Sequence, residues 1–345
     1  MAQRTTLRDV AKEAGVSTGA VSLILNGRPN RLSAETRDAV LAAAQKLHYV
    51  PNQNARSLVT NRTTLIALIV PDIENMYFAS LARCIEEECQ KQGYSLLIAN
   101  SNDSRDTESN LIQRLTSRDV DGLMFIPSNE SYDYIDQMRT QLETVPCPVT
   151  FIDRMVAADW CDSVGFDNRQ GGRLAAQCLL DAGHTRIGCI TGDKHAKSSS
   201  SRWLGFAQRL SEAGVTLDPD LQVAGDYRVD SGYRGADQII DGGATAVFCC
   251  NDLMALGFLN RLRERGLDCP HDMSVIGYDN ILPRFGLQTE VTTIEQDVVL
   301  LAQRSWQMLY ARICESHSQG NPWMESPRVQ LLKPTLIDNH TVRHL

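Results

Sequence analysis

Apolar residues recur at helical spacing in three short segments of the first fifty residues. The first segment, LRDVAKEA, follows Thr6, which together with Asp9 forms the S/T-x-x-D/E signal that begins a helix, and Gly15 ends it. Ser17 and Ser33 are placed to cap the second and third helices. Three short helices with a glycine turn between the first two are typical of a helix-turn-helix. Any small three-helix bundle shares the periodicity, but not the turn spacing.

The second and third helices each have an apolar stripe that we expect to be buried. Val16 lies in the turn before the second helix, where it is expected to act as an apolar plug. The predicted stripes are Val21, Ile24 and Leu25 in the second helix, and Val40, Leu41, Ala44 and Leu47 in the third.

From residue 64 the pattern changes to short, continuous apolar runs that alternate with amphipathic stretches. Such runs are typical of strands in parallel sheets that helices cover on both faces. Eight strands exceed one comfortable sheet, so the predicted fold class is α/β with two doubly wound parallel-sheet halves, which bind ligands at the carboxyl ends of their strands. The predicted strands are LIALIVP, SLLIANS, GLMFIPS, PVTFIDR, DSVGFD, RIGCITG, TAVFCCN and SVIGYD.

Charge divides the chain at the same place. Residues 1–62 carry nine Lys or Arg residues and four acidic residues, a net charge of +5, although the whole chain has a formal net charge of −8. The remainder therefore carries −13. A basic head on an acidic body indicates that the head alone binds a polyanion such as DNA.

Several other classes of protein are not expected. No apolar run approaches the roughly 20 residues that cross a bilayer, and the first residues lack the apolar region of a secretory signal, so we expect a cytoplasmic, nucleoid-associated protein with no membrane partner. The ten cysteines lack metal-ligand spacing, which favours small buried residues over disulfides or zinc. Without a dinucleotide fingerprint, a P-loop or a G-x-S-x-G elbow, the sequence predicts no enzyme and no cofactor.

Two long stretches carry a family resemblance. The segment TLRDVAKEAGVSTGAVSLILNG, followed by LSAETRDAVLAAAQKLHYVPNQNARSLVTNRTTLIALIVP, closely resembles the N-terminal signature of the lactose-repressor/galactose-repressor (LacI/GalR) family of bacterial transcription regulators. Segments such as DSVGFDNRQGG, SRWLGFAQRL and SVIGYDN resemble the family's effector-binding core, which is related in fold to periplasmic sugar-binding proteins. The resemblance implies a helix-turn-helix head over 1–50, a hinge over 51–62, and a core over 63–345 with an N-subdomain of about 63–163 and 294–324 and a C-subdomain of about 164–293 and 325–345.

The resemblance assigns contacts with DNA to the second helix and the hinge. It implies that 17–26 is the recognition helix and that 52–60 becomes helical only on operator DNA. The polar hinge agrees with this, since an isolated helix is marginal below about 12 residues. Leu58 is interpreted as a minor-groove wedge, the alternative being a stray surface leucine. The candidate DNA-binding residues are Thr6, Ser17, Thr18, Gly19, Ala20, Ser22, Leu23, Asn26, Arg31, Asn52, Asn54, Ala55, Arg56 and Leu58.

The core is expected to bind a small effector between its two halves. The polar and aromatic groups that follow the strands suit a sugar or a sugar phosphate. A regulator that responds to a nucleobase or nucleoside is an alternative. A sugar-binding protein without DNA binding is another, but it requires export and leaves the basic head unexplained. The serine-rich loop 192–202 either contributes specificity or is a plain surface loop. The resemblance implies that Phe78, Arg202, Tyr227, Asn251, Asp279 and Gln296 contact the effector, with Asp153 and Arg154 as a further pair. Asn75, Tyr77 and Ser128, which follow predicted strands, complete the candidate effector-binding residues.

Together these features predict a ligand-responsive repressor that binds a palindromic operator as a homodimer. Two recognition helices would meet symmetric half-sites while two hinges insert at the centre. The end of the chain, LIDNHTVRHL, is too short and polar for the apolar heptad helix of family tetramers, so a dimer is expected. Effector binding would open or close the cleft and thereby stabilise or melt the hinge.

Thr18, Gly19 and Leu23 match the positions at which the family places its base-reading side chains, which predicts little direct readout through hydrogen bonds. Specificity would then come from half-site spacing and from the central base step that Leu58 opens. Leu58→Ala should therefore weaken specific binding in a gel shift more than Thr18→Ala does. A larger loss for Thr18→Ala would make the helix the main reader.

Overall fold

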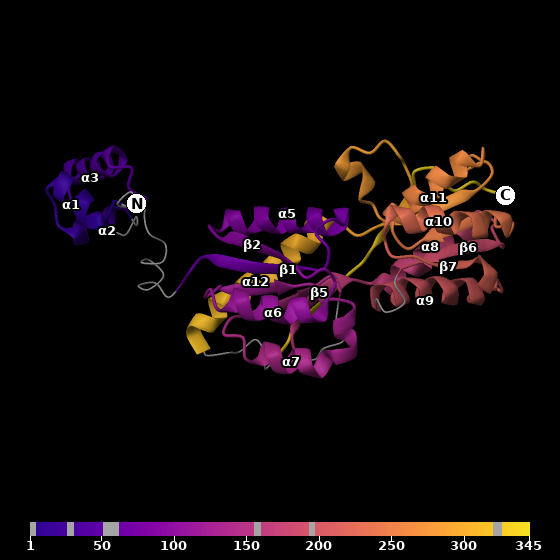
Figure 1. Ribbon diagram of the computed structural model, residues 1–345, viewed down its shortest axis with the longest axis horizontal. Helices are drawn as coiled ribbons and strands as arrows, with labels where there is room; N and C mark the ends of the chain where they lie inside the picture. The colour runs from indigo at the N-terminus through magenta and orange to yellow at the C-terminus, as the bar shows by residue number, and fades with distance from the viewer. Residues whose placement is uncertain (1–4, 26–30, 51–61, 155–159, 193–196, 320–325) are drawn as a thin grey trace. The chain divides into compact units, whose positions relative to one another are not determined.

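The computed structural model describes residues 5–25, 31–50, 62–154, 160–192, 197–319 and 326–345 (Figure 1). The chain forms two compact units, residues 1–63 and residues 64–345, here called the head and the core.

The head contains the three helices that the apolar spacing predicts: α1 (Leu7–Ala14), α2 (Thr18–Leu25) and α3 (Ala34–Lys46). Thr6 and Asp9 form a reciprocal capping box at α1, and Gly15 ends this helix in the left-handed conformation with a φ of 68°. The Ser17 hydroxyl accepts a hydrogen bond from the backbone N–H of Ala20 at 3.2 Å, and Ser33 caps α3 in the same way. All of these predicted helix boundaries are confirmed.

The hydrophobic interior of the head is small, and one residue of the predicted apolar stripes lies outside it. Val10, Val21 and Val40 are fully buried, one from each helix. Leu41, which we expected inside, is 48% exposed, and Ala43 is buried instead. The reason is geometric, since the buried positions of α3 follow the i, i+3, i+4 spacing from Val40, and Leu41 lies about 100° around the helix.

The first half of the core is a six-stranded parallel sheet, sheet A, with the order β11-β5-β4-β3-β1-β2. Helices α5 (Met76–Lys91) and α12 (Val298–Gln319) cover one face, and α6 (Arg105–Thr116), η1 (Glu130–Tyr134) and α7 (Ile135–Glu143) cover the other (Figure 1). The strands are β1 (Leu65–Val70), β2 (Ser95–Asn100), β3 (Gly122–Phe125), β4 (Val149–Ile152), β5 (Asp162–Phe166) and β11 (Val329–Leu332).

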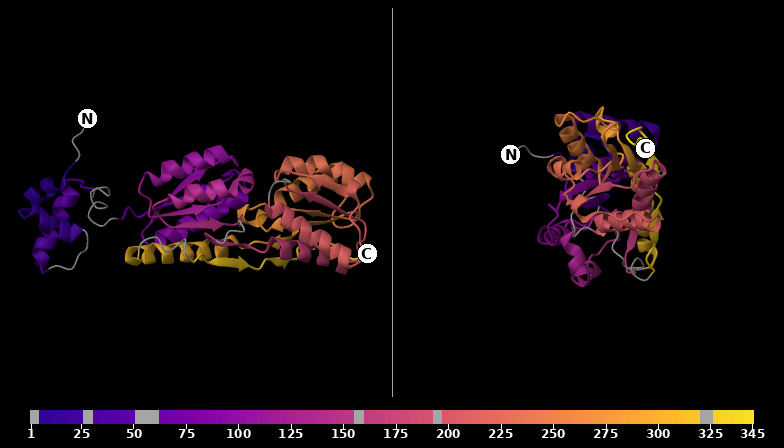
Figure 2. Two further views of the ribbon diagram at one scale, coloured as in Figure 1. Left: turned by 90° about the horizontal axis from the view of Figure 1, so that it is seen from below. Right: turned by 90° about the vertical axis from the view of Figure 1, so that its right-hand side faces the viewer.

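The second half is another six-stranded sheet, sheet B, with the order β12-β10-β9-β8-β6-β7, in which only β12 runs antiparallel to its neighbour. Helix α8 (Asn168–Asp181) packs on α9 (Lys197–Glu212), and α10 (Val229–Asp241) packs on α11 (Asp252–Glu264); the two pairs cover the two faces (Figure 2). The strands and short 3-10 turns are β6 (Ile187–Thr191), η2 (Pro219–Leu221), β7 (Gln222–Ala224), β8 (Ala246–Cys249), β9 (Ser274–Asp279), η3 (Leu282–Phe285), β10 (Thr292–Glu295) and β12 (Thr335–Ile337).

The chain crosses between the two sheets three times, from β5 to α8, from β10 to α12 and from β11 to β12. The positions of these crossovers in the sequence do not coincide with the predicted subdomain boundaries. The boundary at 163/164 cuts β5, which belongs wholly to sheet A, and the boundary at 293/294 cuts β10, which belongs to sheet B. Strand β11 falls within the predicted C-subdomain, but it pairs with β5 in sheet A.

The fold class is the predicted one, and all eight predicted strands are present. Seven of the ten cysteines are buried, and none forms a disulfide, as their apolar surroundings predict. Among the described residues, no helix is both long enough and apolar enough to span a bilayer.

Helices α8 and α9 approach so closely that glycine is required at their contact. A Cβ atom on Gly172 would lie 1.9 Å from the carbonyl oxygen of Arg202, and one on Gly205 would lie 1.9 Å from that of Arg169. Both neighbours are backbone atoms, which cannot move aside alone. The glycines therefore determine where α9, and with it Arg202, lies against α8.

Gly172→Ala should consequently destabilise the core by about 1–3 kcal/mol, because the helices must separate to admit the methyl group. Thermal unfolding of the full chain measures this as a lower Tm. Gly19→Ala is the control, since a Cβ there meets only the Ser17 hydroxyl, at 3.8 Å. An unchanged Tm for Gly172→Ala would contradict the close contact.

Candidate functional site

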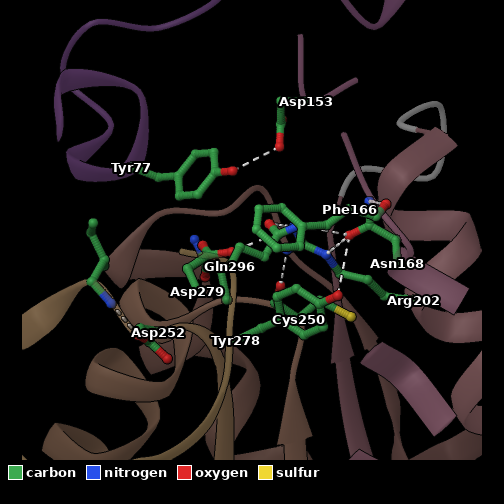
Figure 3. A network of polar contacts seen from close by, with 12 residues as sticks. Tyr77, Asp153, Phe166, Asn168, Arg202, Cys250, Asp252, Tyr278, Asp279 and Gln296 are labelled. Atoms are coloured by element: carbon green, nitrogen blue, oxygen red, sulfur yellow. Dashed lines mark hydrogen bonds and ion pairs between the residues drawn. The ribbon is translucent and has the colours of Figure 1, made fainter. Parts of the chain in front are cut away.

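The predicted effector residues come together where the carboxyl ends of the two sheets face each other. Side chains that follow β1 and β4 in sheet A meet side chains that follow β8 and that end β9 in sheet B (Figure 3). The cavity between them has a volume of about 30 Å³, roughly the share of one water molecule in the liquid. Nine of the eleven predicted residues line it: Asn75, Tyr77, Phe78, Asp153, Arg154, Arg202, Tyr227, Asn251 and Asp279.

Arg202 is the centre of this site, although only 5% of it is exposed. Its Nε donates to Asn168 Oδ1 at 2.7 Å, and its Nη1 donates to the carbonyl oxygen of Cys250 at 2.6 Å. Its Nη2 donates to Gln296 Oε1 at 2.8 Å and lies 3.4 Å from Asp279 Oδ1. The guanidinium also covers the ring of Tyr278, 3.8 Å from its centroid. A charge this deeply buried is tolerated because each of its nitrogens has an acceptor.

Two buried carboxylates share the cavity with this guanidinium. Asp153 accepts a hydrogen bond from the Tyr77 hydroxyl at 2.9 Å. Asp279 Oδ1 is buried without a hydrogen-bond donor of its own. Burial raises the pKa of Asp153 and raises that of Asp279 well above its usual range, and Arg202 only partly opposes the shift. Asp279 Oδ1 is therefore an acceptor that a ligand with hydroxyl or N–H donors can use.

Three residues of the site have a left-handed backbone. The φ angles are 63° at Asp153, 67° at Tyr227 and 104° at Asp279. None of them is glycine, so each costs free energy that other contacts must offset. Such conformations cluster where a side chain must be aimed, and here all three belong to the lining of one cavity.

A second network supports the sheet A side of the cavity. The buried Arg154 donates through Nη1 to Asp103 Oδ1 at 2.6 Å and to the carbonyl oxygen of Pro127 at 3.0 Å. Its guanidinium lies over Phe78, 5.5 Å from the ring centroid. The guanidinium therefore holds Phe78 against loops that follow three different strands of sheet A.

An ion pair joins the two halves nearer the surface. Arg228 Nη2 lies 2.8 Å from Asp72 Oδ2, and Arg228 Nη1 lies 3.7 Å from Glu74 Oε2. Asp72 and Glu74 follow β1 of sheet A, whereas Arg228 precedes α10 of sheet B. Because Arg228 is 59% exposed, solvent screens this contact.

Two predicted residues do not line the cavity. Ser128 is fully buried, and both its hydroxyl and its backbone N–H serve the carboxylate of Glu108, through Ser131 and directly at 2.6 Å respectively. Burial raises the pKa of Glu108, whose carboxylate needs these donors. Gln296 lies behind Arg202, which it holds by its side-chain oxygen.

Sequence reasoning missed Asn168, to which three side chains donate. Its Oδ1 accepts from Arg202 Nε at 2.7 Å, from the Tyr278 hydroxyl at 3.3 Å and from Gln296 Nε2 at 3.5 Å. The available signal was its place two residues after β5 in GFDN, the same offset at which Asn251 follows β8. The part of the serine-rich loop at 193–196 lies outside the described residues, while Arg202 itself lies in α9.

The candidate DNA-binding residues are distributed differently. Ser17, Thr18, Gly19, Arg31 and Thr6 are exposed, Leu23 is 36% exposed, and Ala20 and Ser22 are half-buried. A Cβ on Gly19 would meet only Ser17 Oγ, so the packing of the head itself does not demand glycine there. Asn26, Asn52, Asn54, Ala55, Arg56 and Leu58 lie outside the described residues.

Both parts of the chain match models of known families. Residues 6–52 match "Bacterial regulatory proteins, lacI family", and residues 176–342 match "Periplasmic binding protein-like domain". A curated relative is the HTH-type transcriptional repressor PurR of Pasteurella multocida strain Pm70, which is 36% identical over 322 residues that span 91% of this chain and 93% of the relative.

Solved structures give the same result over nearly the whole chain. The lac repressor dimer bound to operator and the anti-inducer ONPF is 26% identical, with a TM-score of 0.85 and coverage of 99% of this chain and 100% of that one. The complex of the transcriptional regulator CelR with cellobiose is 28% identical, with a TM-score of 0.71 and coverage of 98% and 100%.

The raised pKa of Asp279 predicts how the stability of the core depends on pH. The folded chain holds this proton at a higher pH than the unfolded chain does, so the contribution of Asp279 to stability falls as the pH rises above about 4. Asp279→Asn removes this linkage, and asparagine tolerates a positive φ. The Tm of the variant relative to the parent should therefore rise by a few degrees between about pH 4 and pH 7.

The matched control is Asp133→Asn, which makes the same substitution at an exposed carboxylate of η1 and so gives the effect of this change away from the buried site. Parallel Tm profiles for Asp279→Asn and the parent would contradict the raised pKa of the buried carboxyl group.

Proposed function

Because this chain belongs to the lacI family of bacterial regulatory proteins, we propose that it represses transcription as a homodimer on a palindromic operator, under the control of a small molecule bound around Arg202. It is a DNA-binding transcription regulator rather than an enzyme. We place it in the cytoplasm, with the nucleoid, and propose no membrane partner. The observation that carries the effector proposal is the buried set of two carboxylates, Asp153 and Asp279, and two guanidinium groups, Arg154 and Arg202, between the sheets.

The balance of charge favours a neutral ligand with many donors. All three nitrogens of Arg202 already donate hydrogen bonds within the protein, so the guanidinium is not free to clamp a phosphate. A phosphate group would instead meet the carboxylates of Asp153 and Asp279. A sugar brings hydroxyl donors to these carboxylates and an apolar ring face to Phe78 and Tyr227. A neutral sugar therefore fits better than a sugar phosphate.

The complex of CelR with cellobiose supports a sugar, since CelR is similar to this chain over nearly its whole length. A nucleobase is the second candidate, because three of the nine lining residues are aromatic and a planar ring with N–H donors suits the same carboxylates.

The small cavity bears on how the effector acts. A volume of about 30 Å³ is far below the roughly 300–1,000 Å³ of typical ligand pockets, so we infer that side chains must move apart when a sugar or nucleobase binds. Admission of a ligand must therefore separate groups from the two sheets, which changes the arrangement of the two halves of the core. In the proposed dimer this change is the signal that reaches the DNA-binding heads.

The test begins with the selection of duplexes from a random DNA library by the full chain, which should enrich a palindrome. Thermal shift with cellobiose, D-ribose, D-glucose, D-glucose 6-phosphate, adenine and hypoxanthine should then show a rise in Tm for a neutral sugar. That sugar should change the affinity for the selected palindrome at least about fivefold, the lower end of typical allosteric coupling.

The rise in Tm should be lost in Asp279→Asn and kept in Asp133→Asn. A rise confined to the nucleobases or to the sugar phosphate would overturn the neutral-sugar proposal. The absence of an enriched palindrome would overturn the proposed operator.

A further inference from the structure

Two of the three crossovers between the sheets meet at one side chain. Asn168 is the first residue of α8 and lies two residues beyond the end of β5, on the first crossover. Gln296 directly follows β10, on the second crossover. These residues are 128 positions apart, yet both accept a hydrogen bond from the guanidinium of Arg202 (Figure 3).

The junction is buried and its bonds are short. Asn168 is 8% exposed, Gln296 is 1% exposed and Arg202 is 5% exposed. The bonds from Arg202 measure 2.7 Å to Asn168 and 2.8 Å to Gln296. Hydrogen bonds from a charged donor in a buried environment are among the stronger ones in proteins, and removal of one partner leaves a costly unpaired group.

Asn168 is the member of the junction that binds the others together. Its Oδ1 also receives the Tyr278 hydroxyl at 3.3 Å and Gln296 Nε2 at 3.5 Å, while its Nδ2 donates to the carbonyl oxygen of Phe166 at 3.4 Å. Phe166 is the last residue of β5, in sheet A, and Tyr278 lies in β9, in sheet B. A single amide group therefore contacts both sheets and both crossovers.

We propose that Asn168 is a positioning residue that fixes Arg202 between the two crossovers, so that displacement of the guanidinium by a ligand is transmitted directly to these crossovers. Asn168 itself does not line the cavity, whereas Arg202 does. A rotation of one half about the crossovers must lengthen at least one of the bonds at this junction. The regulatory consequence rests on the proposed effector function, but the junction itself does not.

Hydrogen–deuterium exchange of the full chain, without any added compound, tests the junction. Asn168→Ala should accelerate amide exchange about tenfold in peptides that cover 294–299 and 200–206, because the anchor of Arg202 and Gln296 is lost. Asn168→Asp keeps the acceptor oxygen for Arg202 and should restore most of the protection at both places. Asn260→Ala, at an exposed position of α11, is the matched control and should change neither peptide.

A purely structural role would give a different pattern. If Asn168 only supported the start of α8, Asn168→Ala would accelerate exchange at 166–172 and leave 294–299 as in the parent, and the proposal would be wrong. Uniform acceleration across the core, or a failure of Asn168→Asp to restore protection, would also overturn it. Because no effector is added, these outcomes are independent of whether a sugar binds.

Discussion

The arrangement of the core depends on the burial of one guanidinium between two sheets. Arg202 reaches this place because Gly172 and Gly205 let α8 and α9 approach to backbone contact, and it stays there because Asn168, Cys250 and Gln296 supply acceptors. Each acceptor comes from a different connection after a strand. The burial of a charge is costly, so the loss of any one acceptor alters the contacts of Arg202 with the other two.

The features that suit this site to bind a ligand also lower the stability of the core. The buried carboxylates have raised pKa values because their ionised forms are poorly solvated, and three lining residues have a left-handed backbone. The rest of the core must offset both features, and its parallel strands and two-sided helical layers provide the apolar burial to do so. A better-packed cleft would be more stable, but it would offer a ligand no acceptor.

Much of this site could be predicted because a parallel sheet places the carboxyl ends of its strands at one edge. Asn75, Asp153 and Asn251 follow apolar runs in the sequence, and the family resemblance independently implies the last two. Ser128 was chosen by the same rule, yet it serves the buried Glu108, and an acidic residue inside a helix 20 positions away gives no sign of such a need. Leu41 shows the same limit in the head, since only packing decides which face of α3 is buried.

The role of Asn168 was hidden for a topological reason. When the boundary is drawn at 163/164, the whole GFDN segment falls in one subdomain and its asparagine is an ordinary helix start. Strand pairing shows that β5 belongs to sheet A and α8 to sheet B, which makes Asn168 a crossover residue. Short, mixed strands such as β10 and β11 carry little apolar signal, so their sheet membership, and with it the second and third crossovers, emerges only from long-range pairing.

The geometry also limits the kinds of coupling that the regulator can use. Because the cavity is small and both crossovers contact Arg202, the proposed mechanism couples ligand entry to rearrangement of the crossovers. A partner that favours one arrangement of the crossovers must therefore change the affinity for the ligand by the same factor by which the ligand changes the affinity for that partner. In a repressor of this family that partner is the operator. The free energy of coupling is then limited by the free energy lost when the cleft opens and the bonds of Arg202 to Asn168 and Gln296 lengthen. Other contacts across the cleft, such as Arg228 with Asp72, add to this limit if they change as well.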